Sequence, residues 1–141
     1  MPLPKADIIE QFNKMKQGNL IELLDIDIVD LGEDFVIGRM PVTPKVHQPE
    51  GVLHGGATVA LAETIGSFAA EILMDLEQVF VRGIEISANH LKGVREGYIY
   101  ARASYIHKGR TTQLMEIKVT DEADNLVCLC KLTTISLPRK K

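Results

Sequence analysis

The segment from His47 to Ser67, HQPEGVLHGGATVALAETIGS, decides how this chain folds. Its first half is a polar loop interrupted by glycine, and its second half is an apolar stretch that predicts a long helix. Gly55 and Gly56 stand where that helix begins. Backbone N–H groups in the first turn of a helix lack partners within the helix, so they attract a carbonyl oxygen or an anion. The loop therefore predicts an oxygen-binding site at the helix N-terminus.

One acid, Glu63, lies within the apolar part of this segment, where packing alone favours a hydrophobic residue. A carboxylate in apolar surroundings costs free energy unless it is paired, protonated or used in chemistry. Donors that stabilise an oxyanion and a nearby carboxylate are the groups needed to attack an activated carbonyl. The combination indicates acyl-transfer chemistry, and a hydrolase in particular.

The composition is typical of a globular protein. The chain has 141 residues, of which 45% are hydrophobic and 25% charged, and we expect residues 1–141 to form a single domain. A formal net charge of −3 provides no basic field for nucleic acid. The start MPLPKADIIEQF lacks the apolar core of a secretory signal, and no apolar run has the length of a membrane span. We therefore expect a cytoplasmic protein with neither nucleic acid nor membrane as a partner.

Periodicity and turn residues predict an α+β domain, with one long helix inserted into an antiparallel sheet of about six strands. A first helix capped by Asp7 is expected to run to about Gly18, and the long helix from about Gly56 to Asp75. Three apolar side chains would share one face of the first helix: Ile8, Phe12 and Met15. The expected strands cover residues 25–30, 35–42, 79–91 with a bend at Gly83, 98–107, 111–120 and 126–137.

The two cysteines, Cys128 and Cys130, lie two residues apart in an expected strand. Their side chains share a face but are too far apart for an easy disulfide, and further ligands at zinc-site spacing are missing from the sequence. His47 and His54 likewise lack a third ligand at a usual spacing. We therefore expect two buried or half-buried thiols, no metal site and no cofactor.

The separation between Gly55 and Glu63 predicts a dimer. Eight residues of helix span about 12 Å, so a carbonyl held at the Gly55 N–H is out of reach of Glu63 in the same chain. Two such helices lying antiparallel across a two-fold axis would bring Glu63 of one chain to the Gly55 end of the other. Ser67 follows Glu63 by four residues and shares its face. We therefore expect two composite sites in each dimer, and the exposed edges of a single sheet also favour pairing.

Three stretches carry a resemblance to a known family: residues 47–67, the segment VRGIEISANHLKGVREGYIYARASYIHKGRTTQ and the segment DEADNLVCLCKLTTISL. In their order and spacing they are similar to hotdog-fold acyl-CoA thioesterases, in the branch of 4-hydroxybenzoyl-CoA, phenylacetyl-CoA and 1,4-dihydroxy-2-naphthoyl-CoA thioesterases. The resemblance implies a hotdog fold, hydrolysis of an acyl-CoA thioester to free acid and coenzyme A, and a dimer of dimers. We expect an aryl-CoA or medium-chain acyl-CoA substrate, and a carrier-protein thioester stays open as an alternative. The chain departs from the family at Glu50, where many relatives have phenylalanine at the mouth of the acyl pocket.

The resemblance also implies roles for particular residues. Glu63 resembles the catalytic carboxylate, which attacks the thioester carbon or activates water, and Gly55 resembles the backbone donor that polarises the thioester carbonyl. Gln48 and His54 resemble loop residues that orient the thioester or the water, and Ser67 resembles a hydroxyl that assists the water. Positions similar to coenzyme A-binding segments are Gly83, His90, Leu91, Lys92, Gly93, His107, Lys108, Gly109, Arg110, Thr111 and Thr112. The cations of the last segment suit the phosphate groups of coenzyme A.

Two alternatives from other classes stay open. The hotdog fold also hosts hydratases and dehydratases that act on acyl thioesters, in which a histidine and an acid move protons at the α and β carbons. The domain could also bind acyl-CoA without turnover. Hydrolysis alone releases a free thiol, so the identity of the product separates a thioesterase from both alternatives.

Overall fold

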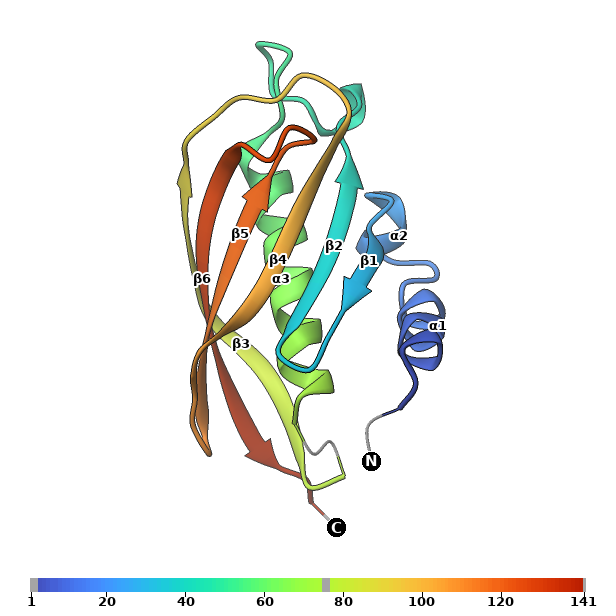
Figure 1. The fold of residues 1–141 in the computed structure, drawn as a ribbon, viewed down its shortest axis with the longest axis vertical. Helices are drawn as coiled ribbons and strands as arrows, with labels where there is room; N and C mark the ends of the chain where they lie inside the picture. Colours follow the sequence, from blue (N-terminus) through green and yellow to red (C-terminus); the bar gives the residue numbers. More distant parts are fainter. Residues whose placement is uncertain (1–2, 75–76, 141) are drawn as a thin grey trace.

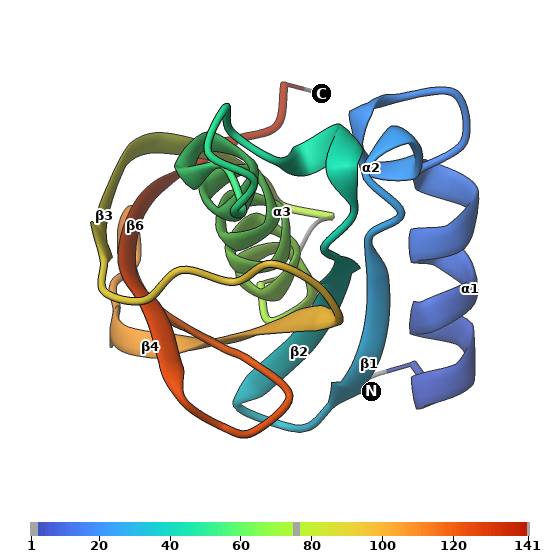
Figure 2. The same ribbon diagram turned by 90° about the horizontal axis from the view of Figure 1, so that it is seen from above.

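The computed structural model describes residues 3–74 and 77–140, in which a curved antiparallel sheet wraps around one long helix, α3 (Figures 1 and 2). The elements are α1 (Lys5–Met15), α2 (Leu20–Leu23), β1 (Asp27–Leu31), β2 (Phe35–Pro41), the 3-10 turn η1 (Pro44–Val46), α3 (Gly55–Ile72), β3 (Val79–His90), β4 (Tyr98–Lys108), β5 (Thr112–Thr120) and β6 (Leu126–Pro138). The expected α+β architecture of a helix wrapped by six strands is confirmed.

The sheet has two different edges. Its strand order is β1-β2-β4-β5-β6-β3, and all neighbouring strands are antiparallel. The edge at β1 is short, and α1 lies beside it (Figure 2). The edge at β3 is 12 residues long, and no strand of the described chain pairs with its outer side. A long unpaired edge is a template for pairing with another chain.

Two glycines let α3 approach the sheet closely. A Cβ atom on Gly38 of β2 would lie 2.1 Å from Cδ1 of Ile65, and one on Gly66 of α3 would lie 2.9 Å from Cδ2 of Leu132. The space that a side chain would need is therefore filled by core side chains. The core between helix and sheet includes fully buried residues from α3 and four strands: Leu61, Ile65, Met40, Ile99, Met115, Ile117 and Leu132.

The first helix differs from its prediction. Asp7 lies in the first turn rather than at the cap, because the helix begins at Lys5 after Pro4, whose carbonyl accepts the N–H groups of Asp7 and Ile8. Proline has a fixed φ and suits the start of a helix. Of the three side chains predicted to share one face, Ile8 and Phe12 are buried, but Met15, the last residue of the helix, is 44% exposed. Phe12 packs edge-on against Phe68 of α3, with ring centroids 5.0 Å apart.

The long helix begins and ends close to its predicted bounds. It starts at Gly55, one residue earlier than expected, because His54 caps it, and it ends at Ile72. The predicted end at Asp75 lies outside the described residues. Within the described ranges, each helix is too short or too polar to cross a lipid bilayer.

Gly38→Ala should lower the free energy of unfolding by about 1–3 kcal/mol, because the added methyl group overpacks the contact with Ile65. Urea denaturation at constant pH measures the change. Gly93→Ala is the matched control, since the nearest atom to its added Cβ would be 3.7 Å away, at Val52. Equal stability of Gly38→Ala and wild type would contradict the close packing of α3 on β2.

Candidate active site

The N-terminus of α3 has a cap that leaves one backbone donor unused. His54 is the N-cap residue, and its Nδ1 accepts a hydrogen bond from the Gly56 N–H at 2.8 Å. The His54 carbonyl accepts the N–H groups of Ala57 at 3.0 Å and Thr58 at 3.2 Å. Within the described part of the chain, the Gly55 N–H donates to no acceptor. Of the two glycine donors, that of Gly55 is therefore the one available to a ligand.

The two glycines make room for two imidazole rings. A Cβ atom on Gly55 would lie 3.0 Å from Nε2 of His90, and one on Gly56 would lie 3.0 Å from Nδ1 of His54. Because Nδ1 of His54 accepts a hydrogen bond, the neutral ring carries its proton on Nε2. His54 thus caps the helix and also presents an N–H donor beside it.

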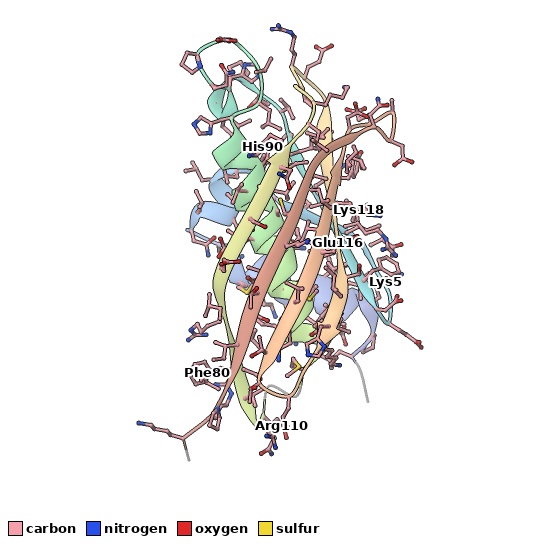
Figure 3. The ribbon with its side chains drawn as sticks, turned by 90° about the vertical axis from the view of Figure 1, so that its left-hand side faces the viewer. Lys5, Phe80, His90, Arg110, Glu116 and Lys118 are labelled. Carbon is pink, nitrogen blue, oxygen red and sulfur yellow. The ribbon has the colours of Figure 1, made fainter. Side chains whose placement is uncertain are left out.

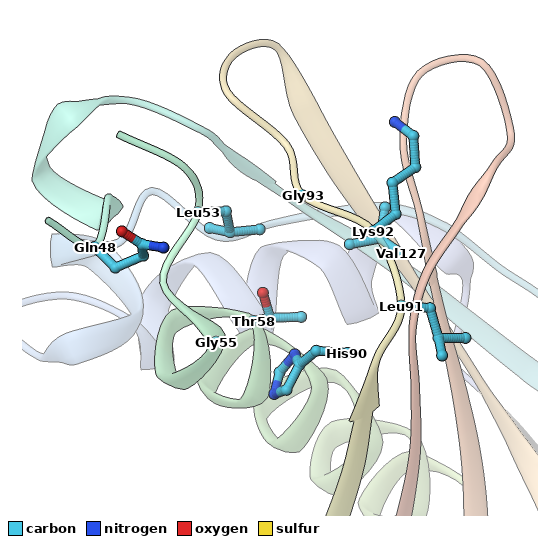
Figure 4. A pocket seen from close by; sticks show the side chains of 9 residues that line it. All are labelled: Gln48, Leu53, Gly55, Thr58, His90, Leu91, Lys92, Gly93 and Val127. Atoms are coloured by element: carbon cyan, nitrogen blue, oxygen red, sulfur yellow. The ribbon is translucent and has the colours of Figure 1, made fainter. Parts of the chain in front are cut away.

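Gly55 lines a pocket of about 430 Å³, within the size range of small-molecule sites (Figure 4). Six of the predicted site residues, from three separate segments, meet there: Gln48, Gly55, His90, Leu91, Lys92 and Gly93. The other lining side chains are largely apolar: Leu53, Thr58 and Val127. Glu50, the departure from the family pattern, is exposed and does not line this pocket.

Gln48 is fixed by its own loop. Its N–H donates to the carbonyl of Val52 at 2.8 Å, and its carbonyl accepts the N–H of Gly51 at 3.0 Å. Its side-chain Oε1 accepts the N–H of Glu50. The amide nitrogen is left for other partners, and Figure 4 shows it directed toward the pocket.

The segment Leu91–Gly93 is held over the pocket by an ion pair with a distant turn. The Lys92 ammonium lies 2.7 Å from Oδ2 of Asp121, at the β5–β6 turn. The same carboxylate accepts hydrogen bonds from the backbone and side chain of Asn125 and from the Ala123 N–H. Lys92 and these donors hold the pKa of Asp121 far below its usual range. Lys92 therefore positions the wall of the pocket in this structure.

Glu63 and Ser67 lie elsewhere in the same chain, against Gly83 of β3. A Cβ atom on Gly83 would lie 3.3 Å from Oε2 of Glu63 and 3.9 Å from Oγ of Ser67. Glu63 is exposed and Ser67 is half-buried. A carboxylate in contact with a glycine of an open sheet edge is accessible to a second molecule.

A β-bulge allows Gly83 and His90 to face the same helix. Gly83 pairs with Thr134 and Glu85 pairs with Thr133, which leaves Ile84 as an extra residue. Side chains of a strand alternate between faces, so residues seven apart would otherwise point to opposite sides. The bulge lies directly after Gly83, where the sequence predicted a bend. The predicted site residues of one chain thus lie at two separate places along β3, one group near His90 and the other near Gly83.

The remaining predicted residues form the β4–β5 hairpin, at the opposite end of the molecule from the pocket. Figure 3 shows His90 toward one end of the sheet and Arg110 at the other. The Lys108 ammonium donates to the carbonyl of Leu73 at the C-terminus of α3, at 2.8 Å. Nearby, burial raises the pKa of Tyr105 to about 12, so its hydroxyl stays protonated and donates to the Ala70 carbonyl at 3.3 Å. Of the two predicted phosphate-binding cations, Lys108 therefore binds a carbonyl group at the end of α3, and Arg110 lies exposed on the turn.

The other ionisable groups near α3 have structural explanations. Burial raises the pKa of Glu71, two turns beyond Glu63, and the charges of Arg82 and Arg139 oppose that shift.

Cys128 and Cys130 are buried and reduced, with sulfur atoms 3.6 Å apart, as expected. In residues 3–74 and 77–140, no three His, Cys, Asp or Glu side chains gather in a group that could hold a metal ion.

Comparisons with known proteins decide the family. The sequence profile of the thioesterase superfamily matches residues 50–128. The 1,4-dihydroxy-2-naphthoyl-CoA hydrolase of Escherichia coli is 41% identical over 129 residues, which are 92% of this chain and 94% of the relative. The chain belongs to the thioesterase superfamily. It is accordingly an enzyme of the thioester hydrolase class, and the resemblance to hotdog-fold thioesterases is confirmed.

Other members of the thioesterase superfamily agree in sequence and in structure. The proofreading thioesterase EntH of Cronobacter turicensis is 40% identical over 126 residues, covering 89% of this chain and 91% of that protein. The crystal structure of a thioesterase from Haemophilus influenzae superposes with a TM-score of 0.89 at 41% identity, covering 92% of this chain and 90% of the other. The two proteins therefore share the hotdog fold over nearly the whole length of both chains.

Sequence reasoning missed two residues that shape the pocket. Asp121 lies between two expected strands, and nothing in the sequence indicated its role because its partner Lys92 is 29 residues away. Thr58 is a buried polar residue one turn after Gly55, and its spacing from the helix start was the available signal.

Asp121→Asn should lower the free energy of unfolding at neutral pH and flatten its dependence on acid pH. The folded-state pKa lies below the unfolded value of about 3.9, so this stabilisation is fully present above the unfolded pKa and is lost as pH falls toward the folded pKa. Urea unfolding of both proteins between about pH 7 and pH 3 measures the difference. Asp124→Asn on the same turn, outside these hydrogen bonds, is the control, and parallel pH curves for wild type and Asp121→Asn would contradict the prediction.

Proposed function

We propose that this enzyme hydrolyses acyl-CoA thioesters, with aryl or medium-chain acyl groups, to a free acid and coenzyme A. The unused N–H of Gly55, which lies at the wall of a partly apolar pocket, carries the proposal. Developing negative charge on a thioester oxygen would be stabilised there by the donor and by the helix dipole. The relative named as a 1,4-dihydroxy-2-naphthoyl-CoA hydrolase supports an aryl-CoA substrate, and the proofreading thioesterase supports hydrolysis of a thioester.

The polar groups around Gly55 are suited to orienting a thioester. The Gln48 amide nitrogen is a second donor toward the pocket, because Oε1 of the same side chain is occupied by the Glu50 N–H. The Nε2–H of His54, the residue that caps α3, is a third donor near the helix start, although His54 does not line the pocket itself. The acyl group would lie against Leu53, Leu91 and Val127. These aliphatic side chains can cover an apolar chain or ring without an aromatic residue in the pocket.

Glu63 is the proposed catalytic carboxylate, contributed by a partner subunit. Antiparallel pairing of two β3 edges around a two-fold axis near Ile86 and Ser87 would set Gly83 of one chain opposite His90 of the other. Glu63 and Ser67, which lie beside Gly83, would then lie beside Gly55 of the partner. Each pair of half-sites would form one complete site, and the dimer would hold two. The family resemblance extends this to a dimer of dimers, which the reaction does not require.

Two chemical routes use this arrangement. Glu63 attacks the thioester carbon to form an anhydride, or it removes a proton from a water molecule that attacks instead, with Ser67 assisting the water. The leaving thiol has a pKa of about 8.5, so it departs with little help from an acid. The chemistry therefore needs no metal and no histidine–serine pair.

Glu63→Gln should reduce thiol release by about a hundredfold to ten-thousandfold, because the amide is neither a base nor an effective nucleophile. Release from a panel of aromatic and aliphatic acyl-CoAs, followed with a thiol reagent, is the measurement, and the wild-type ranking defines the acyl preference. Glu71→Gln is the matched control on the same helix, where Arg82 and Arg139 engage the acid, and it should retain turnover.

Near-normal turnover by Glu63→Gln would remove the proposed mechanism. Hydration or dehydration of the acyl chain by the wild type, with no free thiol, would replace hydrolysis with the lyase alternative. Binding of acyl-CoA without any product would leave a binding protein.

A further inference from the structure

Three polar side chains are buried together beneath the β4–β5 hairpin. Gln113 of β5 and Thr134 of β6 are paired residues and are fully buried, and Ser136, two residues further along β6, is 4% exposed. Burying a polar side chain costs free energy unless its hydrogen bonds are remade. The catalytic proposal above makes no use of these residues.

The bonds of this trio run from the core to the backbone of the hairpin turn. Thr134 donates through its hydroxyl to Oε1 of Gln113 at 2.8 Å. Nε2 of Gln113 donates to the Gly109 carbonyl at 3.0 Å and to Oγ of Ser136 at 3.2 Å. Ser136 donates through its hydroxyl to the Arg110 carbonyl at 2.7 Å. The network therefore fixes two consecutive peptide groups of the turn, and the side-chain atoms involved are satisfied.

Fixing those carbonyls also fixes the direction of the adjacent N–H groups. In a trans peptide the C=O and the following N–H point in opposite directions. With the carbonyls of Gly109 and Arg110 bound on the inner side, the N–H groups of Arg110 and Thr111 face outward. Neither of these two N–H groups has an acceptor within the described residues, and both residues are exposed. Two outward N–H groups beside an arginine side chain form a surface that suits a phosphate.

We propose that Gln113, held by Thr134, is a positioning residue that orders the turn 109–111 to receive the phosphate groups of coenzyme A. This inference rests on the proposed function, because it assumes that the acyl group is presented on coenzyme A. Gln113 touches no reacting atom. It sets the affinity for the nucleotide part of the substrate and leaves the chemistry at Gly55 and Glu63 unchanged. An enzyme built this way favours coenzyme A esters over the same acyl group on a short thiol.

The test measures, in three variants, the hydrolysis of two thioester substrates and the binding of free coenzyme A. Gln113→Leu removes the bonds to the turn at similar volume, Thr134→Val removes the bond that orients Gln113, and Thr134→Ser keeps that hydroxyl as the matched control. Gln113→Leu should raise KM for the preferred acyl-CoA about tenfold, equivalent to about 1.4 kcal/mol, with kcat little changed. Thr134→Val should move KM in the same direction, and Thr134→Ser should match wild type. Hydrolysis of the same acyl group on N-acetylcysteamine, which lacks the nucleotide, should be unaffected by all three.

Calorimetry with free coenzyme A makes the test independent of turnover. Weaker coenzyme A binding by Gln113→Leu and Thr134→Val, but not by Thr134→Ser, supports the inference even if the wild type releases no thiol, an outcome that would remove the proposed function alone. Unchanged coenzyme A affinity overturns the inference, as does an equal loss of activity on both substrates, which indicates a structural role. Hydrolysis of the N-acetylcysteamine ester without any coenzyme A binding would overturn the inference and leave thioester hydrolysis standing.

Discussion

The rigidity of α3 is the constraint on which the rest of the proposed site depends. His54 caps the helix in a way that frees the Gly55 N–H alone among the first donors of the described helix, and the next chemically suitable carboxylate is eight residues further on. A helix cannot bend to close about 12 Å, so both groups cannot act on one thioester within a single chain. The proposed chemistry therefore requires a second copy of the chain, and the open edge of β3 is the surface on which we propose that it pairs.

β3 joins the two proposed half-sites because different parts of the strand lie against different parts of α3. His90 lies beside Gly55, and Glu63 and Ser67 lie beside Gly83. A Cβ atom on Gly55 would be 3.0 Å from Nε2 of His90, and one on Gly83 would be 3.3 Å from Oε2 of Glu63, so glycine gives each side chain more room. The bulge at Ile84 brings both ends onto the face that covers the helix. Without the extra residue, one half-site would point away from α3. The proposed chemistry and the proposed dimer thus follow from one strand and one helix.

Much of this arrangement could be predicted from sequence, for identifiable reasons. The apolar period of the long helix and the alternation in the strands fixed the α+β plan, and the HGG sequence located the helix start. Pattern alone did not show that His54 would use its ring to cap Gly56, that Lys92 would pair with Asp121, or that Gln113 would bond to the turn at Gly109. These contacts depend on side-chain directions and on strand pairing between distant residues. The prediction that Asp7 caps the first helix was wrong because the helix begins two residues earlier, at Lys5, directly after Pro4.

The measurement that tests the central claim most directly is the activity of a mixture of two inactive variants, Glu63→Gln and Gly55→Pro. Proline removes the donor N–H and is tolerated at the first position of a helix, and His54 already has the extended backbone that proline requires before it. Gly55→Ala crowds His90 similarly but keeps the N–H, so it reports the effect of crowding alone. Unfolding and refolding the two variants together should restore about one quarter of wild-type activity, since half of the dimers are mixed and each has one intact site of two. No recovery from a mixture that forms mixed dimers would show that each chain holds its own complete site, contrary to this account.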